Sequence, residues 1–106
     1  MGRFVIVAYK PKPGCGPALL AVVAKHLQVL SAEGLVTARP AHVMRGGDGT
    51  IVEVFEWASQ DAIGRAHSNA AVGALWAEFG AVCDYVPLSS LPEAQKMFAE
   101  FESVDQ

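Results

Sequence analysis

The chain of 106 residues has few cysteines, and the two that it has lie far apart. Cys15 and Cys83 form no CxxC pair, and neither has a histidine nearby at the spacing of a metal ligand. The sequence therefore predicts neither a disulfide framework nor a cysteine-based zinc site. Reduced thiols are expected, and with them a cytoplasmic location.

Long hydrophobic runs are also missing. The first apolar run, Phe4–Tyr9, is six residues long and ends at Lys10-Pro11. It is too short for the apolar region of a signal peptide. No run approaches the roughly 20 residues of a membrane-spanning helix. We therefore expect no membrane association.

Two signals of other ligand classes are absent as well. The basic residues are scattered over separate expected elements and form no stripe that would follow a nucleic acid. The loop around Gly14 and Gly16 does not match the glycine-rich turn of flavin and nicotinamide sites. We therefore expect no nucleic-acid partner, no cofactor and no metal.

What the chain has is apolar residues and an uneven charge. Hydrophobic residues make up 52% of a chain long enough for one domain, residues 1–106. Residues 1–47 hold six bases and one acid, a net +5, and residues 48–106 hold two bases and ten acids, a net −8. A small domain of this composition leaves apolar surface exposed or covers it with a partner, and we favour a homodimer.

The first half of the chain predicts a strand, a helix and a second strand. Phe4–Tyr9 is short, apolar and rich in β-branched residues, as in a strand covered on both faces. Ala18–Glu33 has the spacing of an amphipathic helix, and Gly34 is suited to end it. Leu35–Arg45 predicts a second strand, which Pro40 confines to a sheet edge or a bulge.

The second half predicts a hairpin and a broken helix. A glycine-rich turn leads into a third strand, Thr50–Trp57, and Ser59 is a candidate N-cap for the helix that follows. The apolar stripes of the two halves of this helix differ in phase by roughly half a turn. We therefore expect a kink or break near Ser68-Asn69-Ala70. Val82–Leu88 predicts a fourth strand.

A capping-box pattern from Ser90 to Glu93 predicts a C-terminal helix over residues 91–102. The expected order is therefore β-α-β-β-α-β with an added helix. This is the ferredoxin-like arrangement of the α+β class, a four-stranded antiparallel sheet with two helices on one face. The other face of the sheet would be apolar and bare, and a second copy of the chain would cover it.

The chain also resembles the dimeric α+β barrel superfamily, and within it the antibiotic biosynthesis monooxygenase-like group. The residues that carry the resemblance are Glu56-Trp57-Ala58-Ser59, Ala62 and the pair Ala66-His67. The resemblance implies a pocket between the sheet and its helices and a C-terminal segment that reaches toward the partner. Its members include cofactor-free quinol oxidases, haem-degrading oxygenases and muconolactone-type isomerases.

The haem-degrading relatives use an asparagine of the first strand and a tryptophan that precedes a histidine on the second helix. Here Phe4–Tyr9 contains no asparagine, and His67 precedes Trp76. Haem is therefore not the expected ligand.

His67 is the leading catalytic candidate, as a base near neutral pH. In the alternative interpretation it bonds a neighbouring carbonyl or carboxylate and holds the bend. Asn69 adds a polar group at the same bend and is a candidate for contact with a substrate. Trp76 would stack on a flat substrate, or would simply belong to the core. His67 and Trp76 point in opposite directions unless the helix breaks near Asn69.

Four more residues are candidates for ligand contact or for structural pairing. Phe79 would pack a ring of the substrate, and Tyr85 lies near a strand end where it could reach the pocket. Glu53 and Glu56 face opposite sides of one strand, and a buried carboxylate needs a partner. Arg39 or His42 would serve as that partner, and structural pairing is favoured over catalysis.

Two hypotheses of function follow. The chain is a cofactor-independent monooxygenase-like or isomerase-like enzyme acting on a small aromatic, quinol or polyketide-like compound. Alternatively, it is a non-catalytic module that binds a small apolar ligand or serves only to dimerise. A solvent-reached cavity lined by His67 and a second titratable group would favour the enzyme, and a filled interior would favour the module.

Overall fold

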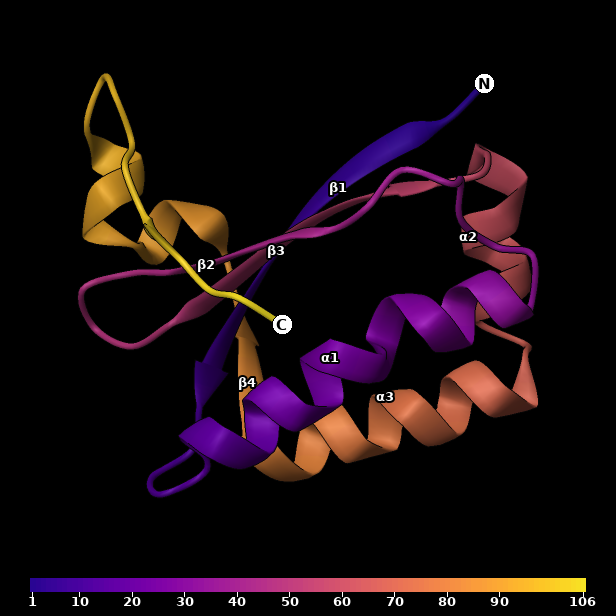
Figure 1. The fold of residues 1–106 in the computed structure, drawn as a ribbon, viewed down its shortest axis with the longest axis horizontal. Helices are drawn as coiled ribbons and strands as arrows, with labels where there is room; N and C mark the ends of the chain where they lie inside the picture. The colour runs from indigo at the N-terminus through magenta and orange to yellow at the C-terminus, as the bar shows by residue number, and fades with distance from the viewer.

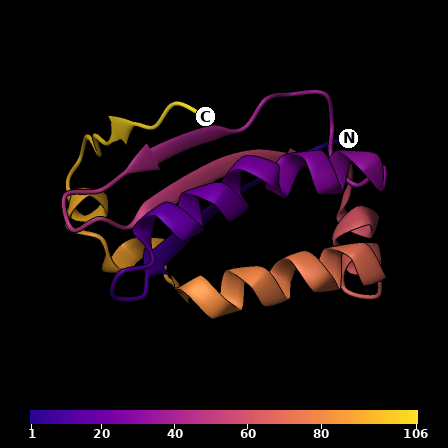
Figure 2. The same ribbon diagram turned by 60° about the horizontal axis from the view of Figure 1, so that its bottom comes forward.

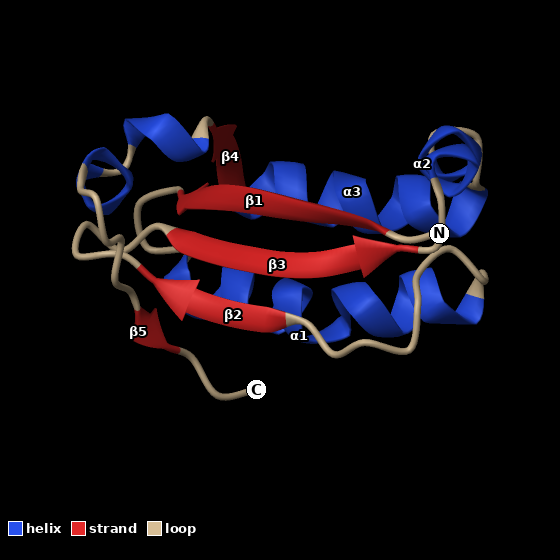
Figure 3. Cartoon of the chain, turned by 90° about the horizontal axis from the view of Figure 1, so that it is seen from above, coloured by secondary structure: helices blue, strands red, loops and turns tan.

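A computed structural model describes all residues, 1–106, as an antiparallel sheet with helices on one of its faces (Figure 1). The strands are β1 (Arg3–Pro11), β2 (His42–Arg45), β3 (Ile51–Trp57), β4 (Cys83–Val86) and β5 (Glu102–Ser103). The helices are α1 (Gly16–Ala32), α2 (Gln60–Ala66) and α3 (Ala70–Val82). Helices α1 and α3 lie side by side under the sheet, and α2 lies at one end of it (Figures 2 and 3). None of these helices is both long and apolar enough to cross a bilayer.

The sheet order is β4-β1-β3-β2-β5, and every neighbouring pair is antiparallel. Strand β3 is therefore central. In the register, Glu53 of β3 lies between Val7 of β1 and Val43 of β2, and Tyr9 lies opposite Ile51. Because side chains alternate along a strand, these five residues share the face that the helices cover.

Helix α1 confirms the predicted amphipathic helix but begins two residues earlier than expected, at Gly16. Pro17 occupies the first turn, where its missing N–H leaves no hydrogen bond unmade. Gly34 follows the helix end with a φ of 69°, a conformation that glycine adopts freely. The buried side chains of α1 are Leu19, Val22, Val23, His26 and Leu30.

The predicted break in the second helix is confirmed, since α2 ends at Ala66 and α3 begins at Ala70. The side chain of Asn69 accepts a hydrogen bond from the amide of Val72 at 3.1 Å and so caps α3. The predicted cap of α2 is also present, where Ser59 accepts from the amide of Ala62 at 3.0 Å. Two separate helices allow both apolar stripes to face the sheet.

The predicted C-terminal helix over residues 91–102 is wrong. The chain instead makes two short 3₁₀ turns, Leu88–Ser90 and Pro92–Gln95, and ends in a fifth strand that the prediction of four strands did not include. The reason lies in contacts with distant parts of the chain, which outweigh the weak preference of a short isolated helix. Leu91 is buried, and the Glu93 carboxylate accepts the amide of Gly47 at 2.8 Å.

The second strand is also shorter than predicted. Only His42–Arg45 forms a continuous ladder, and Val36 makes an isolated bridge to Trp57. The interruption includes Pro40, in agreement with its predicted effect on this strand.

The outer face of the sheet is partly covered by the end of the chain (Figure 2). Leu91 packs there with Ala8 and Val52, so the expectation of a wholly bare face is wrong at this end. At the other end Phe4 and Ile6 remain 59% and 51% exposed. The chain thus leaves two apolar side chains of β1 exposed at this end of its outer face.

Candidate functional site

A cavity of about 310 Å³ lies between the sheet and the helices. Seven of the eight residues that line it are hydrophobic, and the remaining one is a histidine. The lining residues are Val5, Val7, Tyr9, His26, Phe55, Trp57, Trp76 and Tyr85. This combination of apolar walls and one polar group is typical of a small-molecule site.

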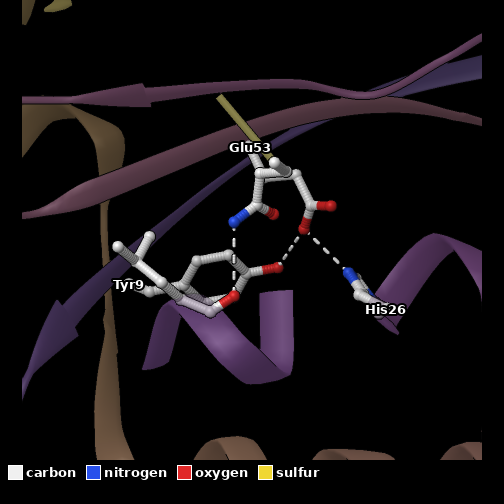
Figure 4. Close-up of polar contacts among 5 residues, drawn as sticks. Tyr9, His26 and Glu53 are labelled. Atoms are coloured by element: carbon white, nitrogen blue, oxygen red, sulfur yellow. Dashed lines mark hydrogen bonds and ion pairs between the residues drawn. The ribbon is translucent and has the colours of Figure 1, made fainter. Parts of the chain in front are cut away.

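The polar chemistry of the cavity comes from three buried side chains (Figure 4). The Nδ1 atom of His26 lies 2.7 Å from Oε1 of Glu53, and the Tyr9 hydroxyl donates to the same oxygen at 2.7 Å. The side chains of His26 and Glu53 are only 5% and 1% exposed. These hydrogen bonds are shielded from water and are worth more than they would be at the surface.

The shared acceptor sets the tautomer of His26. Oε1 of Glu53 accepts both bonds, so Nδ1 of His26 is the donor, and in the neutral imidazole Nε2 then keeps its lone pair. Nε2 makes no hydrogen bond within the protein, yet it is not an enclosed atom. Because His26 lines the cavity, Nε2 is its free acceptor for a ligand.

The Tyr9 hydroxyl is a permanent donor in this arrangement. Its burial, together with the charge and hydrogen bond of Glu53, raises the pKa of Tyr9 far above the ordinary value. The hydroxyl therefore stays protonated throughout the physiological range and holds the Glu53 carboxylate in place.

The ring of His26 is held by packing as well as by its hydrogen bond. It meets Phe55 and Phe79 edge-on, with centroid distances of 5.2 and 5.0 Å. Phe79 also stacks on the ring of Tyr9 at 4.8 Å. Helix α1 supplies the histidine, β3 the carboxylate and β1 the tyrosine, so the site spans three elements far apart in sequence.

The cavity opens beside the short strand β4. This strand pairs only with residues 8–11 of β1, which leaves the first half of β1 as a free edge (Figure 3). Tyr85 of β4 is 54% exposed and Trp76 is partly exposed, while both line the cavity. Burial raises the pKa of the Tyr85 hydroxyl. A ligand could enter between these two aromatic side chains.

His67, the histidine singled out from the sequence, does not line this cavity. It is exposed, and its Nδ1 atom lies 2.8 Å from the carbonyl of Ile63 one helical turn earlier. Its ring meets Trp76 edge-on at 5.2 Å, so the break does bring the two rings together. This geometry is that of the alternative role, a histidine that holds the bend. Asn69 caps α3 and donates to Glu33 at 2.8 Å, away from the cavity.

The other predicted ligand contacts divide into two groups. Trp76 and Tyr85 line the cavity directly. Phe79 and Glu53 lie behind its wall, where Phe79 stacks on Tyr9 and Glu53 bonds Tyr9 and His26. Glu53 therefore acts on a ligand of this cavity only through the residues that it holds.

Glu53 and Glu56 do face opposite sides of the sheet, as the spacing predicted. Arg39 is confirmed as a partner, although for Glu56, at 2.9 Å. Thr37 donates to the same Glu56 oxygen at 2.8 Å. His42 is exposed and pairs with neither carboxylate.

Sequence reasoning missed His26, although its signal was present. The residue lies three positions after Val23 and four before Leu30, on the apolar stripe of the first helix. A histidine on such a stripe needs a buried partner, and the neighbouring strand offers a glutamate amid apolar residues. These two anomalies together could have identified the pair.

Comparison of the chain with protein-family models, curated proteins and solved structures found no match. No group of three or more histidine, cysteine, aspartate or glutamate side chains is placed to hold a metal ion. The interpretation of the site therefore depends on its own geometry.

Proposed function

We propose that the chain is a cofactor-independent enzyme that removes a proton from a small, flat, weakly acidic compound such as a phenol, a hydroquinone or an enolisable ring. The observation that carries the proposal is the free Nε2 of His26 in an apolar cavity, with the Glu53 carboxylate on the opposite ring nitrogen. A carboxylate in that position orients the ring and balances the charge that forms on it.

The reaction begins when the acidic O–H or C–H of the ligand gives its proton to Nε2. The imidazolium that results is stabilised by Glu53, whose Oε1 accepts from Nδ1 at 2.7 Å. The anion of the ligand stays in the apolar cavity. It then takes the proton back from Nε2 at another atom, which is isomerisation. Alternatively, its carbanion forms a C–O bond to dioxygen, the resulting peroxide takes the proton from Nε2, and the hydroperoxide loses water to leave a new carbonyl group, which is oxygenation.

The aromatic residues of the cavity suit a flat ligand. Trp57 and Phe55 lie on the sheet side with centroids 5.2 Å apart, and Trp76 comes from α3. A volume of about 310 Å³ lies at the lower end of the range for small-molecule pockets. It fits a compound of one or two rings.

A non-catalytic binding role is the second candidate. The Tyr9 hydroxyl already donates to Glu53 and is not available to donate a proton to a ligand. His26 therefore offers the cavity a hydrogen-bond acceptor, but no buried general acid stands beside it. In a binding module, Nε2 would accept a hydrogen bond from a ligand hydroxyl and no proton would be transferred.

The fold itself supports a finer assignment. We propose that it is ferredoxin-like and belongs to the dimeric α+β barrel superfamily, in its antibiotic biosynthesis monooxygenase-like group. The strand order β4-β1-β3-β2 and the two long helices on one face support this, and β5 is an addition. In this proposal the protein is cytoplasmic, and a second copy covers the end of the outer face near the exposed Phe4 and Ile6.

The proposed activity is tested with oxygen uptake and product analysis over a panel of phenols and hydroquinones. His26→Gln removes the base, and its rate should fall about 10²–10⁴-fold. His67→Gln is the matched control, a histidine outside the cavity, and should retain the wild-type rate. A binding module gives no turnover with any compound, although ligands still bind. Equal rates for wild type and His26→Gln would remove His26 from the mechanism.

A further inference from the structure

A second cavity of about 310 Å³ lies on the other side of Glu53. It is bounded by α1, by β2 with the residues before it, and by the last three residues of the chain. Its apolar wall includes Val23, Leu27 and Val43, and Glu53 lines this cavity but not the first one. Glu53 is thus the partition between two cavities.

One carboxylate oxygen of Glu53, a residue that lines this second cavity, has no hydrogen-bond partner. Both hydrogen bonds of the carboxylate fall on Oε1, and Oε2 has no partner within the protein. The side chain is only 1% exposed, yet Oε2 is not an enclosed atom. Figure 4 shows the dashed lines from Tyr9 and His26 meeting at one carboxylate oxygen of Glu53, while the other oxygen carries none. An unpartnered carboxylate oxygen in such surroundings is costly, so a donor from a ligand would be bound there.

The charges around the second cavity select the kind of donor. Its charged lining residues are Glu53 and Asp105, both acidic. The nearest bases along these elements are engaged elsewhere: Lys25 bonds Glu78 at 2.6 Å, and Arg45 bonds Glu102 at 3.2 Å. The residues that line the cavity thus include two acids and no base, although Glu53 also bonds His26 on its other side, and this lining favours a cationic ligand.

We propose that this cavity binds a small organic ammonium ion with an apolar body. The ammonium donates to Oε2 of Glu53, and the apolar body lies against Val23, Leu27 and Val43. Asp105 adds a second negative charge at the chain end. The site shares Glu53 with the proposed activity, but its ligand does not contact Nε2 of His26 and does not enter the first cavity.

The end of the chain forms the outer wall of this site. The amide of Val104 donates to the carbonyl of Val43 at 2.9 Å, and the side-chain amide of Gln106 donates to the carbonyl of Leu20 at 3.3 Å. These bonds hold the last residues across the space between β2 and α1. Asp105, between the two anchors, is thereby kept at the cavity.

Benzylammonium is the probe, and benzyl alcohol is its neutral match in size and shape. Titration calorimetry on the full chain should show that benzylammonium binds at least about tenfold more tightly than benzyl alcohol, because the alcohol cannot make a charged hydrogen bond. Ala24→Leu fills the second cavity and should weaken benzylammonium at least tenfold. Ala21→Leu, on the exposed part of the same helix and outside every cavity, should leave it unchanged.

Asp105→Asn removes the charge at the chain end without removing bulk, and should weaken benzylammonium several-fold while leaving benzyl alcohol unaffected. Equal affinity of the two probes, or benzylammonium binding that survives Ala24→Leu, would overturn the proposal. Neither result bears on turnover of phenols, so failure of this site and failure of the proposed activity are distinguishable.

Discussion

Glu53 is a carboxylate on the central strand of an apolar sheet, between Val7 and Val43. Its burial is offset by two donors, the Tyr9 hydroxyl and Nδ1–H of His26. Removing the carboxylate would leave both donors buried without an acceptor. The stability of the site therefore depends on the three residues as a unit.

Glu53→Leu tests this dependence. Leucine fills much the same space as glutamate but accepts no hydrogen bond, so the two buried donors lose their acceptor. We expect the free energy of unfolding to fall by about 2–4 kcal/mol. Urea denaturation followed by circular dichroism measures it. Glu78→Leu breaks only the surface pair with Lys25 and should cost less than about 1 kcal/mol. A loss no larger for Glu53→Leu than for Glu78→Leu would contradict this account.

The raised pKa of Tyr9 predicts a loss of stability in alkali. The folded chain keeps the proton well above the ordinary pKa of 10.0, whereas the unfolded chain releases it near that value. The contribution of Tyr9 is therefore complete below about pH 10 and declines above it, by up to about 1.4 kcal/mol per pH unit. Denaturation of wild type and Tyr9→Phe between pH 8 and pH 11 should give a steeper alkaline decline for wild type. Parallel curves would show that Tyr9 ionises normally.

At the scale of elements, the break between α2 and α3 is a local feature with a local cause. The Asn69 side chain caps α3 by accepting from the amide of Val72. Asn69→Ala should lower the free energy of unfolding by about 1 kcal/mol, and Asn69→Ser, which can still cap, should lower it by less. Thermal denaturation compares them, with Ser68→Ala as a neighbour that caps no helix. Equal losses for the alanine and serine variants would argue against the cap.

The elements that could be predicted from the sequence are those with a strong local signal. The first helix has a long apolar period and Gly34 at its end, and the phase shift around Asn69 indicated the break. The C-terminal segment was mispredicted because its conformation depends on distant contacts, such as Glu93 with Gly47. Spacing along one chain does not contain such contacts.

The same distinction holds for the site. That one of the two β3 carboxylates needs a partner could be predicted from the apolar strand around it. That its partners are His26 and Tyr9 could not be read from periodicity, because the residues lie on three separate elements. The sequence favours the exposed His67 as a candidate because it lies next to the predicted break between two helices. His26 lies inside a regular helix, where no such local signal marks it.

At the scale of the whole molecule, exposed apolar groups lie at two places. Phe4 and Ile6 are exposed at one end of the outer face, and Met97 and Phe98 are 92% and 78% exposed in the segment near the chain end. In a two-fold dimer, each such region of one copy can meet the other region of its partner. This arrangement would cover all of these side chains at once.

Sedimentation velocity tests the dimer. Wild type should sediment as a dimer at micromolar concentration, and Ile6→Glu should shift it to a monomer because a charge would be buried in the interface. Circular dichroism checks that the variant stays folded, and Lys10→Glu serves as a charge-changing control on the same strand. A wild-type monomer at every concentration would rule out the proposed partner.

The central claim is that Nε2 of His26 is an unprotonated acceptor that faces a ligand cavity. Ring nitrogen NMR of the histidines, recorded near neutral pH during titration with phenol, tests it most directly. The account predicts a proton on Nδ1, a bare Nε2, and an Nε2 signal of His26 that moves on phenol binding while that of His67 stays constant. A proton found on Nε2, or a His26 signal that does not respond to bound phenol, would contradict the account.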